Sequence, residues 1–197
     1  MKIKELQYKK INIDMKKPFK IALGSTDFYE GYFVKVVSDS GLEGYGEAIP
    51  TPFITGDTMG SVEAELSIFR QALKGSELST EAVNERMKAL ARSSKASRAA
   101  VDMALYDILG KKADLPLYQI LGGYRSSMKT SYTVDLVGAP EARIQAKELL
   151  DDGVLFFKIK LGKSTDEDFE RVKAVREVIG DDKMICVDFN QSYLTKE

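Results

Sequence analysis

The 197-residue sequence has no histidine and only one cysteine, Cys186. Without histidine, a Ser-His-Asp triad, a Cys-His pair and a histidine-ligated zinc site are all excluded. Any acid-base chemistry therefore falls to Lys, Asp, Glu or Tyr. A single cysteine cannot form an internal disulfide, and its place inside an apolar run predicts a small core residue.

Long apolar runs and an excess of either charge are also missing. The formal net charge is -1, from 29 basic and 30 acidic residues, which provides neither a basic stripe for nucleic acid nor a polybasic segment for a membrane. The apolar runs fall far short of the roughly 18 residues of a membrane span, and the polar start lacks a signal peptide's apolar core. We therefore expect a cytoplasmic protein with no nucleic-acid or membrane partner.

The first two thirds of the chain predict an α+β domain. Residues 2–50 have the β-branched and aromatic content of an antiparallel meander, with a hairpin formed by residues 31–37 and 42–48. Residues 18–27 are less regular, and residues 50–58 are predicted to form a loop. Helical periodicity then predicts three helices, and Gly122-Gly123 marks the domain boundary. The helices are expected at residues 61–73, 80–91 and 95–111.

Beyond the boundary, strands and helices alternate. Strands are predicted at residues 129–137, 154–161 and 183–189. Pro140 opens the first intervening helix, and Ser164 is placed to cap the second. Strands separated by helices run parallel in one sheet, normally buried on both faces.

Polar residues interrupt two of these strands near their carboxyl ends. Side chains alternate along a strand, so Lys158 and Lys160 share one face. The next strand ends in Asp188-Phe189-Asn190. Because catalytic and binding groups collect beyond the carboxyl ends of parallel strands, we predict a site there. The alternative is a strand with one wet face on which both lysines are simply solvated.

Seven short segments extend this pattern over essentially the whole chain. In their order they resemble the enolase superfamily, within it the muconate-lactonising subgroup, and most specifically the dipeptide epimerases. The resemblance implies an α+β capping domain over residues 1–124 and the start of a modified (β/α) TIM-type barrel, its first three strands, over residues 125–197. The segments are Lys17-Pro18-Phe19-Lys20, Gly44-Tyr45-Gly46-Glu47-Ala48, Ile54-Thr55-Gly56-Asp57-Thr58, Ala104-Leu105-Tyr106-Asp107, Leu117-Tyr118-Gln119-Ile120-Leu121-Gly122-Gly123, Lys158-Ile159-Lys160 and Asp188-Phe189-Asn190-Gln191.

The resemblance also implies a reaction, namely removal of the α-proton of a carboxylate substrate and a 1,1-proton transfer that epimerises a dipeptide. It implies that Lys160 is the general base, Lys158 its electrostatic neighbour, and Asp188 the first of three carboxylate ligands to Mg²⁺. A divalent cation on the substrate carboxylate stabilises the enediolate. Two alternatives stay open: cycloisomerase or o-succinylbenzoate synthase activity on the same scaffold, and a non-catalytic fragment that acts as a binding or assembly module.

Two departures from the family pattern bear on the substrate and on the fine geometry of the site. Relatives that prefer Ala-Glu carry an arginine after the Ala-Leu of the first capping loop, whereas this chain has Ala22-Leu23-Gly24. Losing that cation undercuts a glutamate preference, so we expect a dipeptide with an apolar or different side chain. Tyr193 stands in place of the tryptophan of the usual Gln-Gly-Trp. The expected substrate-binding residues are Phe19, Gly24, Phe53, Ile54, Thr133 and Asn190.

The length of the barrel portion also matters. A complete barrel takes about 250 residues, so we expect residues 125–197 to be the N-terminal piece of one. Such a piece should be inactive alone, since an epimerase needs a base on each face of the substrate and one carboxylate makes a poor magnesium site. Its open sheet edge should favour self-association, so we expect a homo-oligomer.

Overall fold

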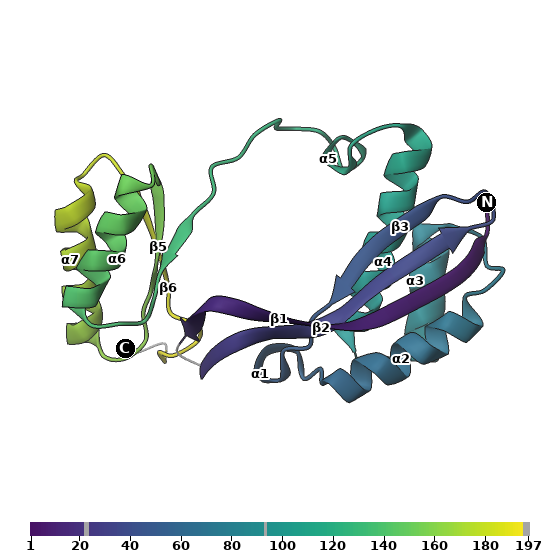
Figure 1. Cartoon of the computed structure of the whole chain (residues 1–197), viewed down its shortest axis with the longest axis horizontal. Helices are drawn as coiled ribbons and strands as arrows, with labels where there is room; N and C mark the ends of the chain where they lie inside the picture. The colour runs from purple at the N-terminus through teal and green to yellow at the C-terminus, as the bar shows by residue number, and fades with distance from the viewer. Residues whose placement is uncertain (22–23, 93, 195–197) are drawn as a thin grey trace. The chain divides into compact units, whose positions relative to one another are not determined.

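The computed structural model describes residues 1–21, 24–92 and 94–194 (Figure 1). The chain forms two compact units, one of Met1–Asp14 with Phe28–Tyr124 and the other of Met15–Asp27 with Arg125–Glu197. Its described residues form two three-stranded sheets, ordered β1-β2-β3 and β4-β5-β6. No helix within the described ranges is both long and apolar enough to cross a membrane.

The first sheet consists of β1 (Ile3–Ile21), β2 (Gly24–Ser38) and β3 (Glu43–Ala48). β2 and β3 pair antiparallel, from Tyr32 opposite Ala48 to Val37 opposite Glu43, which confirms the predicted hairpin. The irregular structure predicted for residues 18–27 is wrong, because residues 18–21 continue β1 and residues 24–27 begin β2. Pro18 is compatible with this because β1 lies at the edge of its sheet, where a missing N–H need not break a ladder.

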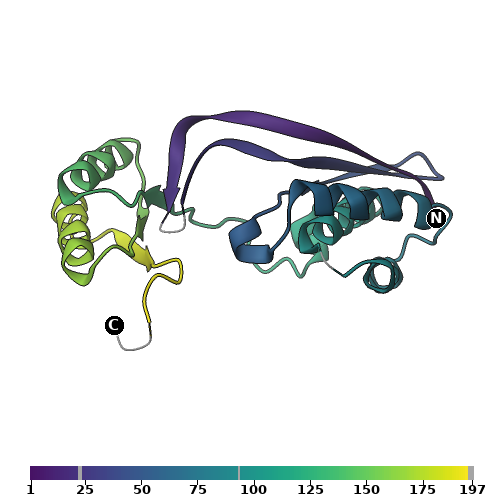
Figure 2. The same cartoon turned by 90° about the horizontal axis from the view of Figure 1, so that it is seen from below.

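Three long helices cover one face of this sheet (Figure 2). The predicted helices are present as α2 (Met59–Ala72), α3 (Thr80–Leu90) and α4 (Lys95–Ala113), with side-chain caps from Thr58, Ser79 and Ser94. The predicted loop at residues 50–58 contains a single helical turn, α1 (Pro52–Thr55). A second short helical turn, α5 (Leu117–Ile120), follows α4. α1 begins at a proline, whose φ suits a first helical position, and ends at Gly56 with φ 78°.

Two glycines of β3 let α4 approach the sheet closely. A Cβ atom on Gly44 would lie 2.0 Å from the carbonyl oxygen of Ala104, and one on Gly46 would lie 2.0 Å from that of Ala100. Both alanines are fully buried. The backbones of strand and helix therefore touch where the sequence places Gly-x-Gly opposite a run of alanines.

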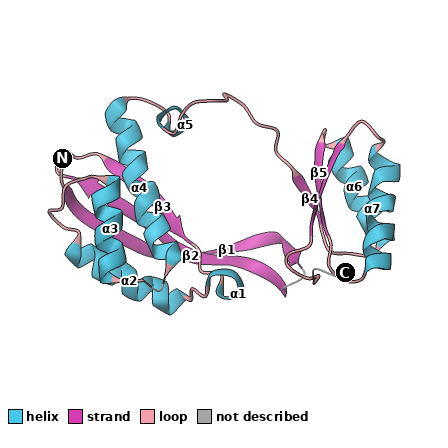
Figure 3. Cartoon of the chain, turned by 180° about the vertical axis from the view of Figure 1, so that it is seen from behind, coloured by secondary structure: helices cyan, strands magenta, loops and turns pink. Residues whose placement is uncertain are grey.

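The second sheet contains β4 (Tyr132–Val134), β5 (Phe156–Lys160) and β6 (Met184–Asp188), all parallel. The intervening helices α6 (Ala139–Asp151) and α7 (Thr165–Ile179) lie together beside it (Figure 3). This confirms the predicted strand-helix alternation. The first strand is shorter than predicted at both ends, and at its carboxyl end the N–H of Asp135 donates to the side chain of Gln145 in α6.

The two faces of β5 differ sharply. Phe157, Ile159 and Leu161 are buried against the helices, whereas Lys158 and Lys160 lie on the opposite face. On α7 the buried stripe contains charged as well as apolar residues. Phe169 is 67% exposed, while the charged residues Asp168 and Arg171 are buried.

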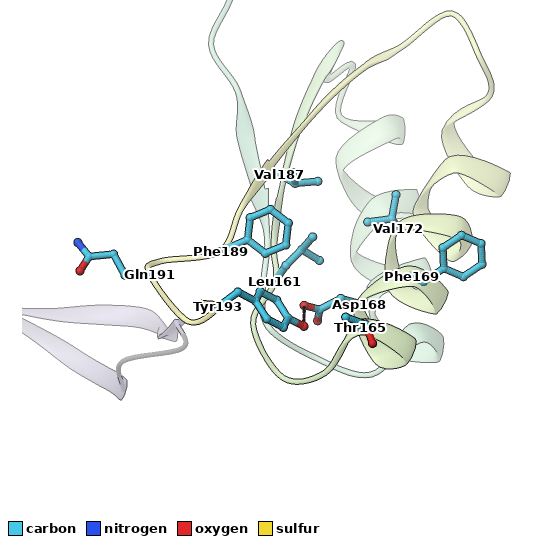
Figure 4. Close-up of a pocket in the computed structure, with 9 residues that line it drawn as sticks. All are labelled: Leu161, Thr165, Asp168, Phe169, Val172, Val187, Phe189, Gln191 and Tyr193. Atoms are coloured by element: carbon cyan, nitrogen blue, oxygen red, sulfur yellow. Dashed lines mark hydrogen bonds between the residues drawn. The ribbon is translucent and has the colours of Figure 1, made fainter. Parts of the chain in front are cut away.

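β6 forms the outer edge of this sheet, with β5 as its one neighbouring strand within the described ranges. A mainly apolar cavity of about 600 Å³ lies between β6 and α7 (Figure 4). It is lined on the helix side by Phe169 and Val172 and on the strand side by Val187 and Phe189. The cavity is on the helix-facing side of the sheet, away from the two lysines, so it is not the predicted site. The homo-oligomer stays a prediction.

Candidate active site

Lys158, Lys160 and Asp188 meet on one face of the parallel sheet. β5 and β6 pair in a register that sets Lys160 opposite Asp188, so the two side chains leave adjacent strands in the same direction. The Nζ atoms of Lys158 and Lys160 each lie 2.8 Å from Oδ2 of Asp188. One carboxylate oxygen is thus shared by two ammonium groups, and Lys160 and Asp188 are the last residues of their strands.

The turn after β6 completes this arrangement. Lys160 Nζ also donates to the amide oxygen of Asn190 at 2.9 Å, and the N–H of Asn190 donates to Oδ1 of Asp188 at 3.0 Å. Asn190 and Gln191 have φ of 47° and 60°, in the left-handed region that asparagine tolerates better than most residues. This turn folds the Asn190 amide back over the strand ends, so that it faces the same lysine as Asp188.

Burial and charge set the ionisation of this cluster. The Lys160 side chain is only 6% exposed, compared with 34% for Lys158 and 27% for Asp188. Hydrogen bonds from Lys158 and then Lys160 hold the pKa of the Asp188 carboxyl well below its usual range, and the N–H of Asn190 adds to this against the opposing effect of burial. Asp188 is therefore ionised at neutral pH, and Lys160 has a nearly dry environment.

The lowered pKa of Asp188 predicts acid sensitivity. A carboxyl whose folded pKa is depressed contributes stability above its unfolded pKa of about 3.9, and the contribution is lost as the pH falls towards the folded value. The free energy of unfolding should therefore fall more steeply below about pH 4 in the wild type than in Asp188→Asn. Urea unfolding followed on NMR signals of β5 and β6 measures the difference. Parallel pH curves for the two proteins would show that the carboxylate is not paired.

The remaining predicted site residues are divided between the two units. Thr133 pairs in register with Lys158 across β4 and β5, so its side chain is on the lysine face. Phe53 and Ile54 lie on α1 in the first unit, where they are 78% and 60% exposed. Phe19 falls in β1 and Gly24 in β2, but only their backbone belongs to the described part of the structure, and Ala22 and Leu23 lie outside it entirely.

The turn that carries Phe53 and Ile54 is anchored by a buried carboxylate. Asp57, only 1% exposed, accepts hydrogen bonds from the N–H groups of Lys95 and Ala96 at 3.2 Å each. These are free donors at the N-terminus of α4, which favours negative charge. The apolar side chains of α1 are thus exposed on a segment whose end is fixed to the helix that packs on the sheet.

A magnesium ion does not fit the described residues as they stand. No group of three or more His, Cys, Asp or Glu side chains comes together anywhere in the described ranges. Asp188 offers one carboxylate, and both of its oxygens already accept hydrogen bonds from Lys160 and Asn190. Magnesium needs near-octahedral oxygen coordination, so Asp188 can supply at most one ligand of such a site.

Sequence reasoning missed the groups that tie the strand ends together. Asp168 and Arg171 on α7 form a buried ion pair at 2.5 Å, and the hydroxyl of Tyr193 donates to Asp168 at 2.8 Å (Figure 4). The available signal was spacing, because both charged residues fall on the helix stripe that also carries Val175 and Ile179. A charge on a buried stripe has a partner or a function.

The comparisons with known proteins agree with this architecture. Residues 5–122 match the family described as "Mandelate racemase / muconate lactonizing enzyme, N-terminal domain", and residues 141–197 match "Enolase C-terminal domain-like". The chain is 37% identical to a hydrophobic dipeptide epimerase of Enterococcus faecalis and 38% identical to an L-Ala-D/L-Glu epimerase of Bacillus subtilis, each over 100% of this chain.

A solved structure extends the comparison. A dipeptide epimerase from Enterococcus faecalis, crystallised with Mg and the dipeptide L-Leu-L-Tyr, superposes with a TM-score of 0.96 at 36% identity, covering 100% of this chain and 56% of that one. The chain likewise spans only 56% and 55% of the length of the two curated relatives. Both parts of the fold therefore have counterparts in that structure. These parts are the antiparallel sheet with its helices and the three parallel strands that match the start of the enolase-type barrel. This chain belongs to the mandelate racemase / muconate lactonizing enzyme family of the enolase superfamily.

Proposed function

We propose that this chain is the N-terminal part of a dipeptide epimerase, with residues 1–124 as the capping domain and residues 125–197 as the first part of the barrel. The observation that carries the proposal is the convergence of Lys158 and Lys160 on Asp188 at the ends of adjacent parallel strands. The two relatives that are 37% and 38% identical over the whole of this chain are dipeptide epimerases, which supports the proposal.

In this proposal Lys160 moves the α-proton. Its side chain is only 6% exposed, and its Nζ donates to Asp188 and Asn190, which hold it in place at the end of β5. Lys158 shares Asp188 from the more exposed position and would balance negative charge that develops on the substrate. Asp188 would contribute one ligand to a magnesium ion, with the other ligands and the second base from residues beyond Glu197.

The test uses the reading frame that contains this segment, extended past Glu197, hereafter the extended protein. Purified with magnesium and incubated in deuterated water with a panel of dipeptides, it should incorporate one deuteron at the α-carbon that is epimerised. Mass spectrometry counts the deuterons, and proton NMR locates them. A folded extended protein that exchanges no α-proton of any dipeptide would remove the proposed function.

We further propose that the preferred dipeptide has apolar side chains. Phe53 and Ile54 are exposed apolar residues on the anchored turn α1, and Gly24 supplies no cation for a distal carboxylate. A hydrophobic dipeptide epimerase is among the similar proteins. The extended protein should therefore have a higher kcat/KM for L-Leu-L-Tyr than for L-Ala-L-Glu.

An arginine introduced at position 24 should shift this preference. A charge-assisted hydrogen bond to a carboxylate is worth about 1.5–3 kcal/mol, or roughly tenfold or more in kcat/KM. Gly24→Arg is therefore expected to raise the ratio of kcat/KM for L-Ala-L-Glu over L-Leu-L-Tyr about tenfold, whereas the uncharged Gly24→Gln should leave it close to the wild-type ratio. Equal ratios for Arg and Gln would mean that this position does not face the substrate.

A further inference from the structure

Arg171 lies completely buried beneath the strand ends. Its Nε donates to the carbonyl oxygen of Val137, just after β4, and its Nη1 lies 3.5 Å from the carbonyl oxygen of Lys160, the last residue of β5. The same Nη1 donates to Oδ1 of Asp168 at 2.5 Å. One guanidinium therefore connects the ends of two strands to the first turn of α7.

Asp168 extends the connection to β6. Its Oδ2 accepts from the N–H of Gly162 at 2.6 Å and from the hydroxyl of Tyr193 at 2.8 Å, so it joins the loop after β5 to the turn after β6 (Figure 4). Burial raises the pKa of the Asp168 carboxyl, but Arg171, Tyr193 and the Gly162 N–H together hold the pKa below its usual range. Asp168 is thus a buried carboxylate with donors from three segments.

The loops joined by Asp168 are also in direct contact. Gly162 has φ 123°, and a Cβ atom there would lie 2.0 Å from Oγ of Ser192. The N–H of Leu161 donates to the carbonyl oxygen of Asp188 at 3.0 Å. The backbone immediately after Lys160 is therefore held against the backbone that carries Asp188. A shift of the loop after β5 or of the turn after β6 would change the position of Lys160 relative to Asp188.

Stability alone is a weak reason for this arrangement. Desolvating a guanidinium and a carboxylate usually offsets most of their attraction, and an apolar replacement of similar volume is often as stable. The Arg171 Nη2 atom is buried and has no hydrogen-bond partner among the described residues, which adds to the desolvation free energy that the ion pair must offset. What the pair provides is fixed geometry, since a planar guanidinium donates in set directions.

We infer that Asp168, Arg171 and Tyr193 form the positioning unit of the Lys160–Asp188 site, setting the distance between the two strand ends that carry those side chains. The inference rests on the proposed function for its catalytic consequence, and its geometric part stands without it. None of the three residues is a catalytic residue. They act through the carbonyl of Lys160, the N–H of Gly162 and the turn after β6.

Tyr193→Phe is the sharpest test, because it removes one hydroxyl at a half-buried position, whereas Arg171→Ala leaves a buried carboxylate unpaired and is liable not to fold. In the 197-residue chain, hydrogen exchange at the amides of Gly162 and Leu161 should accelerate about tenfold, with amides of the first unit unchanged. In the extended protein, kcat should fall about tenfold with KM for L-Leu-L-Tyr unchanged, as is typical for partners that orient site residues. Arg171→Lys keeps the positive charge but lacks the planar guanidinium, so the kcat of this variant should also be lower than that of the wild type.

Tyr32→Phe is the matched control, since it removes a hydroxyl that donates to Glu63 at 3.0 Å in the first unit. It should alter neither the two amides nor kcat. Wild-type exchange rates at Gly162 and Leu161 in Tyr193→Phe would overturn the inference, and so would accelerated exchange with an unchanged kcat. If the wild-type extended protein exchanges no dipeptide α-proton, the proposed function fails, and the amide rates alone decide whether the positioning unit exists.

Discussion

Replacing Lys160 with alanine in the extended protein is expected to lower α-proton exchange about a thousandfold, within the range that general acid-base catalysis contributes. The loss should be stereospecific, because a base at this position reaches only one face of the substrate. Exchange from one epimer should disappear, and exchange from the opposite epimer should fall much less. Deuterium incorporation measured separately for the two epimers gives both rates.

Lys163→Ala is the matched control for this substitution. Lys163 lies in the loop directly after β5 and pairs with Glu167 on an exposed surface, so its loss should leave both exchange rates close to wild type. Equal losses for the two epimers in Lys160→Ala would mean that the lysine contributes electrostatically and does not carry the proton. Unchanged rates would exclude it from the reaction.

Gly46→Ala is expected to have the largest effect on stability, lowering the free energy of unfolding of the first unit by about 3 kcal/mol or more. The added methyl group would lie 2.0 Å from the carbonyl oxygen of Ala100 and 2.9 Å from its carbonyl carbon. Both atoms belong to the backbone of α4, so no side-chain rotation can relieve the overlap. The helix must move away from β3, which opens the core around it. Urea unfolding followed on α4 amides measures the loss.

Gly60→Ala provides the comparison, because this glycine is in α2 and a Cβ atom there would meet only the Thr58 hydroxyl at 4.0 Å. Alanine at an accommodating helical position stabilises by up to about 1 kcal/mol. The two substitutions add the same methyl group with opposite expected signs. A Gly46→Ala protein as stable as the wild type would show that α4 does not lie on β3.

Strand alternation and strand ends were sufficient to predict the centre of the site. Lys158 and Lys160 are two residues apart in a strand, so they had to share a face, and Asp188 ends the next parallel strand. Register then brings Asp188 opposite Lys160. Parallel order follows from the intervening helix, so no long-range information was needed to expect these side chains together.

The support beneath the site could not be predicted in the same way. Asp168 and Arg171 are three residues apart in a helix that has acidic and basic residues on every side, and only the fold shows that these two are inside. The contact of Tyr193 with Asp168 spans 25 residues. Such contacts depend on how two loops pack, which local periodicity does not determine.

Residues 18–27 illustrate a different limit. Pro18, Gly24 and the polar residues that follow Gly24 favour a loop by local propensity, yet β1 and β2 include residues 18–21 and 24–27. Pairing with a neighbouring strand outweighs weak local preferences, because β propensity reflects the surroundings more than the residue itself. At the carboxyl end of β4 the surroundings shorten a strand instead, because the N–H of Asp135 donates to a side chain of α6.

A double-mutant cycle between Lys160 and Asp188 tests the meeting of these two side chains most directly, and it needs only the 197-residue chain. Lys160→Met, Asp188→Asn and the double variant are unfolded in urea at neutral pH, and Lys163→Met replaces Lys160→Met in a control cycle. A coupling free energy of about 1–2 kcal/mol is predicted for Lys160 with Asp188, and additivity for the control. Additive effects within about 0.5 kcal/mol for Lys160 and Asp188 would contradict the account.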